Sequence, residues 1–324
     1  MAGALARRLL NAGLTLALVT VVVFCLIHLA PGDPLGGEAE DDHRRLTPAA
    51  REALRVHYRL DQPLHRQYLL WIADVSRGDL GLSFHDRRPV WEKIHERVGT
   101  TVTLNALALG VMLALAVPVG TVAALRRDSL WDRLPAVGTY LLYAVPVFWA
   151  GLLLQILFAV RLGWLPLAGL RGPGHDLMAP LERLLDTAAH LVLPVACLSY
   201  GGLAYLSRFV RATLIDNAVA DTWRAAQARG LSPLAVLFRH GFRQAGVPML
   251  TLAGFLLPAL VGGSVIVESV FAIPGLGRLF VEATFQRDVP VLMGLTLLSG
   301  TATLAGILAA DLTYAVVDPR VRRG

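Results

Sequence analysis

The sequence has 324 residues, of which 55% are hydrophobic and 17% charged, and its formal net charge is +6. An apolar fraction above the roughly 45–50% of soluble domains excludes an ordinary soluble protein and favours an integral membrane protein. The positive charge does not by itself indicate a nucleic-acid partner, because an unequal number of basic residues on the two sides of a membrane gives the same total.

Six stretches of the sequence lack Asp, Glu, Lys and Arg, and each reaches the roughly 20 residues that a helix needs to cross a bilayer. They are residues 9–32, 99–125, 134–160, 187–207, 245–267 and 289–310. The first stretch has no small-residue cleavage site and ends in APGDP, which indicates a retained span rather than a signal peptide. Cys25 and Cys197 fall within these runs, where we expect them to be small buried residues. The sequence therefore predicts an all-α integral membrane protein with six transmembrane helices in a single domain.

The longest connection, residues 33–98, contains signals for two further helices. Thr47-Pro48 is typical of an N-cap followed by proline at the first helical position. A second helix is predicted from Pro63, with Gly78 at its end. One face of this helix would carry Leu64, Tyr68, Trp71, Ile72 and Val75. We interpret that face as packing onto the outer ends of the spans, and a docking surface for an external partner is the alternative.

The placement of arginine sets the predicted orientation. Among the 30 basic residues, Lys93 is the only lysine. The two termini, the loop after residue 125 and the segment 208–244 together carry 14 basic residues, whereas the two short loops opposite carry 5. The positive-inside rule therefore places both termini and segment 208–244 in the cytoplasm, and residues 33–98 outside the membrane.

The spans lack the groups that gradient-driven carriers usually need. Such carriers place ionisable or coordinating side chains at membrane depth. The predicted spans instead hold Asn11, Asn105 and Gln155, with His28 and His190 near the ends. This disfavours a proton-coupled carrier, while coupling through backbone carbonyls stays open.

Patterns for catalysis and nucleotide binding are also missing. The sequence HERVG at 95–99 has Gly99 where a zinc protease carries its second histidine, so two ligands on one helix face do not form. Lys93 stands between Glu92 and Ile94 and not in the glycine-rich phosphate loop that binds ATP. We therefore expect no catalytic residue, metal or cofactor in this chain, and any ATPase that drives transport must be a separate polypeptide.

A basic elbow separates the fourth and fifth spans, with the sequence TWRAAQARGLSPLAVLFRHGFRQ at 222–244. A short helix is predicted up to Arg229, with Gly230 as its C-terminal cap, Ser232 as the next N-cap and Pro233 as the first residue of a second helix. Three functions fit this elbow: an amphipathic helix on anionic lipid, a lever docked into a cytoplasmic partner, or plain positive-inside anchoring. The fixed Gly-Leu-Ser-Pro turn weakens the lipid interpretation, since a surface anchor gains nothing from it.

The elbow resembles the EAA loop of ABC importer membrane subunits, and specifically that of the dipeptide/oligopeptide/nickel permease branch. Further similarities to that branch follow in its order and spacing: APGDP after the first span, LDQPLHRQYLLWI and GDLGLS in residues 33–98, GGSVIVESVFAIPGLGRL at 262–279, and the ending YAVVDPRVR. The general EAA pattern has glutamate where this chain has Arg224, and arginine is usual there in the peptide branch.

The resemblance implies a type I ABC importer permease fold and assigns roles to two sets of residues. The first set would couple the chain to an ATPase: the small residues allow close approach in a groove of that subunit, and the arginines pair with its acidic groups. These residues are Arg224, Ala225, Ala226, Arg229, Gly230, Ser232, Pro233 and Arg239. The second set would shape a loop at the outer mouth of the path, where glycine and proline demand special backbone geometry. These residues are Glu268, Pro274, Gly275 and Gly277, and we expect them to be structural rather than to contact substrate.

The resemblance also implies the rest of the machine. It consists of a second homologous permease, two ATPase subunits that bind ATP and Mg²⁺, and an extracytoplasmic binding protein that delivers short peptides to a bacterial inner membrane. Uptake of nickel or a nickel chelate by the same machine is the nearest alternative. A gradient-driven carrier and a membrane scaffold without transport activity are the others.

Overall fold

The computed structural model describes residues 2–29, 48–215, 225, 228–230, 232–236, 260 and 264–317. Most of the predicted fifth span, 245–267, lies outside these residues. The described part is helical, apart from loops and one isolated antiparallel bridge between Leu82 and Pro89. In chain order the helices are α1 (Ala2–Leu29), α2 (Pro48–His57), α3 (Leu64–Ser76), α4 (Val90–Leu125), α5 (Leu130–Tyr143), α6 (Val147–Leu154), the π-helix η1 (Gln155–Arg161), the 3₁₀ turn η2 (His175–Leu177), α7 (Pro180–Ile215), α9 (Pro233–Val236), α11 (Val265–Val270), α12 (Leu276–Phe285) and α13 (Val289–Val317).

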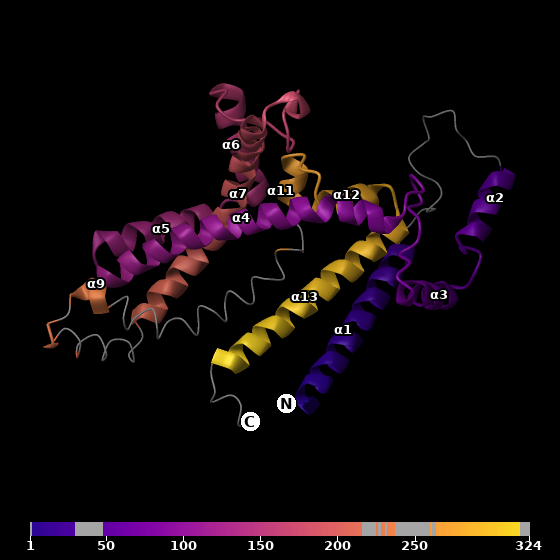
Figure 1. Ribbon diagram of the computed structural model, residues 1–324, viewed down its shortest axis with the longest axis horizontal. Helices are drawn as coiled ribbons and strands as arrows, with labels where there is room; N and C mark the ends of the chain where they lie inside the picture. Colours follow the sequence, from indigo (N-terminus) through magenta and orange to yellow (C-terminus); the bar gives the residue numbers. More distant parts are fainter. Residues whose placement is uncertain are drawn as a thin grey trace.

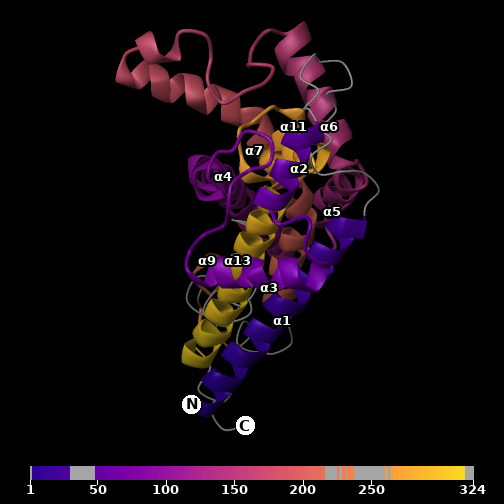
Figure 2. The same ribbon diagram turned by 90° about the vertical axis from the view of Figure 1, so that its right-hand side faces the viewer.

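Four of these helices are long and apolar enough to cross a membrane: α1, α4, α7 and α13. They coincide with the first, second, fourth and sixth predicted spans. The helices α4 and α7 continue beyond the apolar stretches, to 36 residues each. In both views α1 and α13 lie side by side, with the start of α1 and the end of α13 at the same end (Figures 1 and 2).

The pair α4 and α7 forms the centre of the described structure, and the two helices cross closely (Figure 1). One face of α4 is buried at every fourth residue, which is the spacing of a single helical face. These buried residues are Leu104, Ala108, Met112, Ala116 and Gly120. At Gly120 a Cβ atom would lie 2.4 Å from the backbone oxygen of Ser207 and 2.7 Å from Cβ of Val210. The crossing therefore depends on the absence of a side chain at Gly120.

The predicted third span, 134–160, is not a single helix in the structure. Its two parts, α5 and α6–η1, meet at an angle of 96°. Pro146 has no N–H group and disfavours helical geometry at the residue before it, so the helix stops there. The carbonyl of Val145 that is freed at this bend accepts a hydrogen bond from Tyr200 Oη at 2.8 Å. The backbone carbonyl that is freed at the break is therefore hydrogen-bonded by a side chain of α7.

The two helices predicted in residues 33–98 are present. Helix α2 begins at Pro48 and α3 at Leu64, directly after Pro63, and Gly78 follows α3 with a φ of +82°. Tyr68 and Trp71 pack against a core that includes residues of α1 and α13, as expected. Leu64 and Ile72, which share the predicted face, are exposed instead.

The two cysteines differ in environment. Cys197 is buried, as expected, and its Sγ donates to the backbone oxygen of Val147 at 3.3 Å. Cys25 is exposed on α1, so the expectation that it is buried is wrong. An apolar run fixes that a residue lies on a membrane helix, but not which face of the helix it occupies.

We predict that Gly120→Ala destabilises the chain whereas Gly110→Ala does not. Both glycines lie on α4, but a Cβ atom at Gly110 meets nothing within 4 Å. The added methyl at Gly120 forces α4 and α7 apart, an overpacking effect of about 1–3 kcal/mol, while alanine at Gly110 gains about 1 kcal/mol of helix propensity. Thermal unfolding of the purified chain in detergent measures both. Equal melting temperatures for the two variants would contradict the close crossing.

Candidate functional site

The predicted outer-mouth loop, residues 264–277, contains the short helix α11, a turn and the first residues of α12. Helix α11 ends at Val270, the chain turns through Ala272, which has a φ of +52°, and α12 begins at Leu276. The turn is closed by a hydrogen bond from Ile273 N to the backbone oxygen of Glu268 at 2.8 Å. The segment is therefore a compact reversal of the chain, in which Val267, Phe271, Ile273 and Leu276 are buried and Ile266 is exposed.

The Glu268 side chain lies at the centre of this loop and is 0% exposed. Its Oε1 accepts from Thr101 Oγ1 at 2.9 Å, and its Oε2 accepts from Arg278 N at 3.1 Å. Thr101 Oγ1 in turn accepts from Leu276 N at 2.8 Å. The N–H groups of Leu276 and Arg278 belong to the first turn of α12, which has no intrahelical partners for them. Glu268 and Thr101 thus cap α12 together, and a negative charge is favourable at that end of a helix.

The glycines of this loop are needed for close approach. A Cβ atom at Gly275 would lie 2.3 Å from Glu268 Oε2, and one at Gly277 would lie 2.7 Å from the backbone of Val265. The φ of Gly275 is −110°, which any residue adopts. The expectation that these glycines supply special backbone geometry is therefore wrong: the left-handed residue of the loop is Ala272, and the glycines make room for the Glu268 carboxylate and for α11.

Two polar side chains that the sequence analysis did not assign complete this region. Thr101 is one of them. The other is Gln155, whose Nε2 donates to the backbone oxygens of Leu167 at 2.8 Å and Val270 at 3.2 Å. In the sequence, Gln155 is a lone amide in an apolar run. Burying an amide in a membrane costs free energy unless the amide forms hydrogen bonds, so this position is the available signal for its role.

The sole lysine joins the segment before α4 to the start of α13. Lys93 Nζ donates to Asp86 Oδ2 at 2.8 Å and to Ser83 Oγ at 3.1 Å. Ser83 Oγ also donates to the buried Asp288, which accepts from Phe84 N at 3.0 Å and directly precedes α13. Burial raises the pKa of Asp86, but hydrogen bonding with Lys93 and Ser83 outweighs it and lowers the pKa to about 2. The carboxylate of Asp86 therefore stays ionised through mildly acidic pH.

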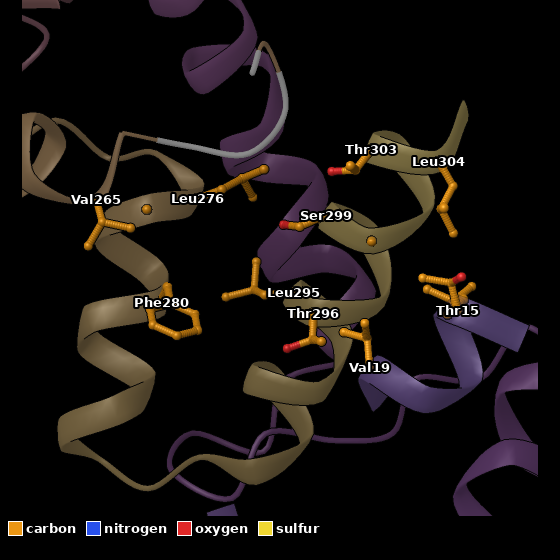
Figure 3. A pocket seen from close by; sticks show the side chains of 13 residues that line it. Thr15, Val19, Val265, Leu276, Phe280, Leu295, Thr296, Ser299, Thr303 and Leu304 are labelled. Carbon is orange, nitrogen blue, oxygen red and sulfur yellow. The ribbon is translucent and has the colours of Figure 1, made fainter. Parts of the chain in front are cut away.

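An apolar hollow of about 490 Å³ lies beside α12, between α1, α11 and α13 (Figure 3). Val19 and Thr15 reach it from α1, and Thr296, Ser299 and Thr303 bring hydroxyl groups from α13 (Figure 3). None of the described residues that line it is charged.

The coupling elbow has the predicted turn. Gly230 has a φ of +82°, the left-handed geometry that ends a helix. Ser232 Oγ accepts from Ala235 N at 3.3 Å, and α9 begins at Pro233. Ala225 and Arg229 are exposed. Three other residues of the predicted coupling set, Arg224, Ala226 and Arg239, lie outside the described residues.

Comparison with known proteins identifies the family to which the chain belongs. Residues 116–323 match the family described as binding-protein-dependent transport system inner membrane component, and residues 1–105 match the N-terminal region of such membrane components. The chain belongs to this family. Its fold class and its place as a non-catalytic permease subunit in an inner membrane follow from that membership.

Relatives match the permease along its whole length. The oligopeptide transport system permease protein AppB of Bacillus subtilis is 35% identical over 99% of both chains. A Brucella suis protein whose name describes a peptide permease is 36% identical over 98% of this chain and 97% of its own. Among solved structures, an inward-facing MetNI methionine ABC transporter chain has a TM-score of 0.51 at 18% identity, covering 69% of this permease and 96% of that chain. That likeness shows the shared type I importer fold.

We predict that Glu268→Gln destabilises the outer-mouth loop. The amide has a single acceptor oxygen, so it cannot accept from both Thr101 Oγ1 and Arg278 N, and one of these two buried donors loses its partner, at a cost of about 1–3 kcal/mol. Thr101→Val should act in the same direction, because it removes the hydroxyl that bridges Glu268 to Leu276.

The matched control is Glu92→Gln, a glutamate on α4 whose side chain is 57% exposed. Thermal unfolding and limited proteolysis of the purified permease measure all three variants. A Glu268→Gln variant as stable as Glu92→Gln would contradict the cap.

Proposed function

We propose that this permease is one of two membrane subunits of an ATP-driven importer for short peptides. The observation that carries the proposal is similarity over nearly the full length to permeases named for oligopeptide and peptide transport. The complete machine would contain a homologous second permease, two ATPase subunits that bind ATP and Mg²⁺, and an external binding protein that delivers the peptide.

The proposed orientation has both termini and the elbow in the cytoplasm. Its support is the excess of arginine on that side of the predicted spans. The start of α1 and the end of α13 lie at one end of the structure (Figure 2), as two cytoplasmic termini require. The outer-mouth loop and the Lys93 cluster would then face the binding protein.

The proposed mechanism is alternating access. ATP closes the ATPase dimer, the elbow moves with it, and α7, which leads directly into the elbow segment, carries the displacement into the membrane. The turn at Gly230 suits this role because a fixed left-handed residue holds the two arms of the elbow at a set angle. The permease itself makes and breaks no covalent bond.

Two rivals differ from this proposal in substrate or in energy source. Nickel uptake by the same machine lacks support, since the relatives above are named for peptides, and the described residues form no group of three metal ligands. A gradient-driven carrier would place ionisable groups at membrane depth. In this permease the Asn105 amide instead donates to the backbone oxygen of Leu260. The Gln155 amide donates to the backbone oxygens of Leu167 and Val270.

Uptake by the assembled complex in proteoliposomes tests the function. We expect labelled dipeptides and oligopeptides to enter when ATP is enclosed with the ATPase subunits, and uptake to survive a protonophore. Uptake that stops with the protonophore and ignores ATP would support the carrier. Uptake of nickel but not of peptide would overturn the substrate class.

We predict that Gly230→Asp uncouples ATP hydrolysis from uptake and leaves the permease in the membrane. A Cβ atom at Gly230 meets nothing within 4 Å, and the strain of aspartate at a φ of +82° is matched in the control below, so an effect seen only at Gly230 reports the contact with a partner. The matched control is Gly78→Asp, because Gly78 has the same φ of +82°, also follows a helical turn and also has nothing within 4 Å. Peptide uptake per ATP hydrolysed should fall for Gly230→Asp and not for Gly78→Asp. Normal uptake by the Gly230 variant would count against a docked elbow.

A further inference from the structure

An ion pair ties the start of α5 to the end of α7. Arg211 Nε donates to Asp132 Oδ1 at 2.6 Å, and Arg211 Nη2 donates to Asp132 Oδ2 at 2.7 Å. Two parallel bonds between a guanidinium and a carboxylate fix both distance and direction. Asp132 is only 6% exposed, so the carboxylate depends on this partner.

The same carboxylate also holds the connection between α4 and α5. Asp132 Oδ2 accepts from Asp128 N at 3.0 Å, and Asp128 has a φ of +63° within the tight turn that joins the two helices. The Asp132 side chain thus connects α5, to which it belongs, with the turn before α5 and with α7. A displacement of α7 along its axis would therefore pull on α5 and on the turn.

Apolar packing holds the other side of the same end of α7. Val210 and Leu214 are buried against Val117, Ala124 and Leu125 of α4. Apolar contacts are non-directional, whereas the paired hydrogen bonds of Arg211 fix both distance and direction. The ion pair is therefore the contact that sets the register between α7 and α5.

Arg211 occupies the last turn and a half of α7 and is the last charged residue of that helix, which ends at Ile215. The elbow follows along the chain. The other residue of the ion pair, Asp132, lies on α5, which leads to the 96° bend at Pro146. The pair therefore lies between the segment that would move and the bent span inside the membrane.

We propose that the Asp132–Arg211 pair is the tie that transmits displacement of the elbow from α7 to α5 and so to the bent third span. The inference rests on the proposed function, because it assumes that the elbow is moved by an ATPase. In this proposal Asp132 and Arg211 are positioning residues, which act through α5 and α7 and not on substrate or nucleotide.

The test uses the complete complex in proteoliposomes and measures peptide transported per ATP hydrolysed. We expect Arg211→Gln and Asp132→Asn to lower this ratio about fivefold or more, the scale of a typical coupling between sites, while ATP hydrolysis persists. Arg208→Gln is the matched control: Arg208 lies one turn earlier on α7 and donates to Ala204 O of its own helix. Arg208→Gln should keep the wild-type ratio.

The charge exchange Asp132→Arg with Arg211→Asp separates a tie from a merely structural contact. Restored uptake per ATP in the exchanged permease supports the tie. Single variants with a wild-type ratio would overturn it. If the neutral variants do not assemble, Arg211→Lys keeps the charge and loses the fork, and a wild-type ratio in that complex would overturn the tie as well.

A measurement without substrate distinguishes failure of the tie from failure of the proposed function. Spin labels at Leu130 on α5 and at Ala225 in the elbow, both exposed, are introduced with Cys25 replaced by serine. In the wild-type background the distance between the labels should stay constant when ATP binds to the complex, because the elements move together. In Arg211→Gln it should change. A distance that behaves alike in both backgrounds contradicts the tie, whatever the complex transports.

Discussion

The constraint on which this structure depends is that backbone groups at membrane depth have no water to bind. At three places where the described chain leaves helical geometry, a side chain from another element accepts from or donates to the free backbone groups. Tyr200 does so at the bend before Pro146, Gln155 does so for the loop at Leu167 and the end of α11, and Glu268 does so for the first turn of α12. These few polar side chains allow a broken span and a short helical reversal to exist in an otherwise apolar bundle.

The polar contacts that this constraint requires are unevenly distributed between the two ends of α4. At one end of α4, Thr101, Glu268 and the Lys93 cluster bind the outer-mouth loop and the external segment through several hydrogen bonds each. At the other end, α4 and α7 meet through apolar side chains and the close approach at Gly120, and the paired bonds between Asp132 and Arg211 add a directional contact between α5 and α7. In the proposed mechanism, a displacement of the elbow would pass through this packing and this ion pair toward a region that several hydrogen bonds hold in place.

Local features of the sequence predicted local structure well. Helix starts at Pro48, Pro63–Leu64 and Pro233, and left-handed glycines at Gly78 and Gly230, follow from the geometry of single residues. The bend at Pro146 did not follow, because Pro118, Pro135 and Pro194 lie inside unbroken helices. At Pro146, Tyr200 of α7 supplies a donor for the freed carbonyl of Val145, and that donor is 55 residues away in the sequence.

The site was predictable in kind but not in its contacts. Similarity of motifs pointed to Glu268 and the elbow, yet the partners of the important side chains are distant: Thr101 is 167 residues from Glu268, and Asp132 is 79 residues from Arg211. No periodicity links such pairs.

Photocross-linking from Ala225 in the assembled complex tests the central claim most directly, with Leu177, 92% exposed on the opposite loop, as the control position. The account predicts a product between Ala225 and an ATPase subunit and none from Leu177. Cross-links from Ala225 to lipid alone, with the ATPase attached elsewhere, would contradict it.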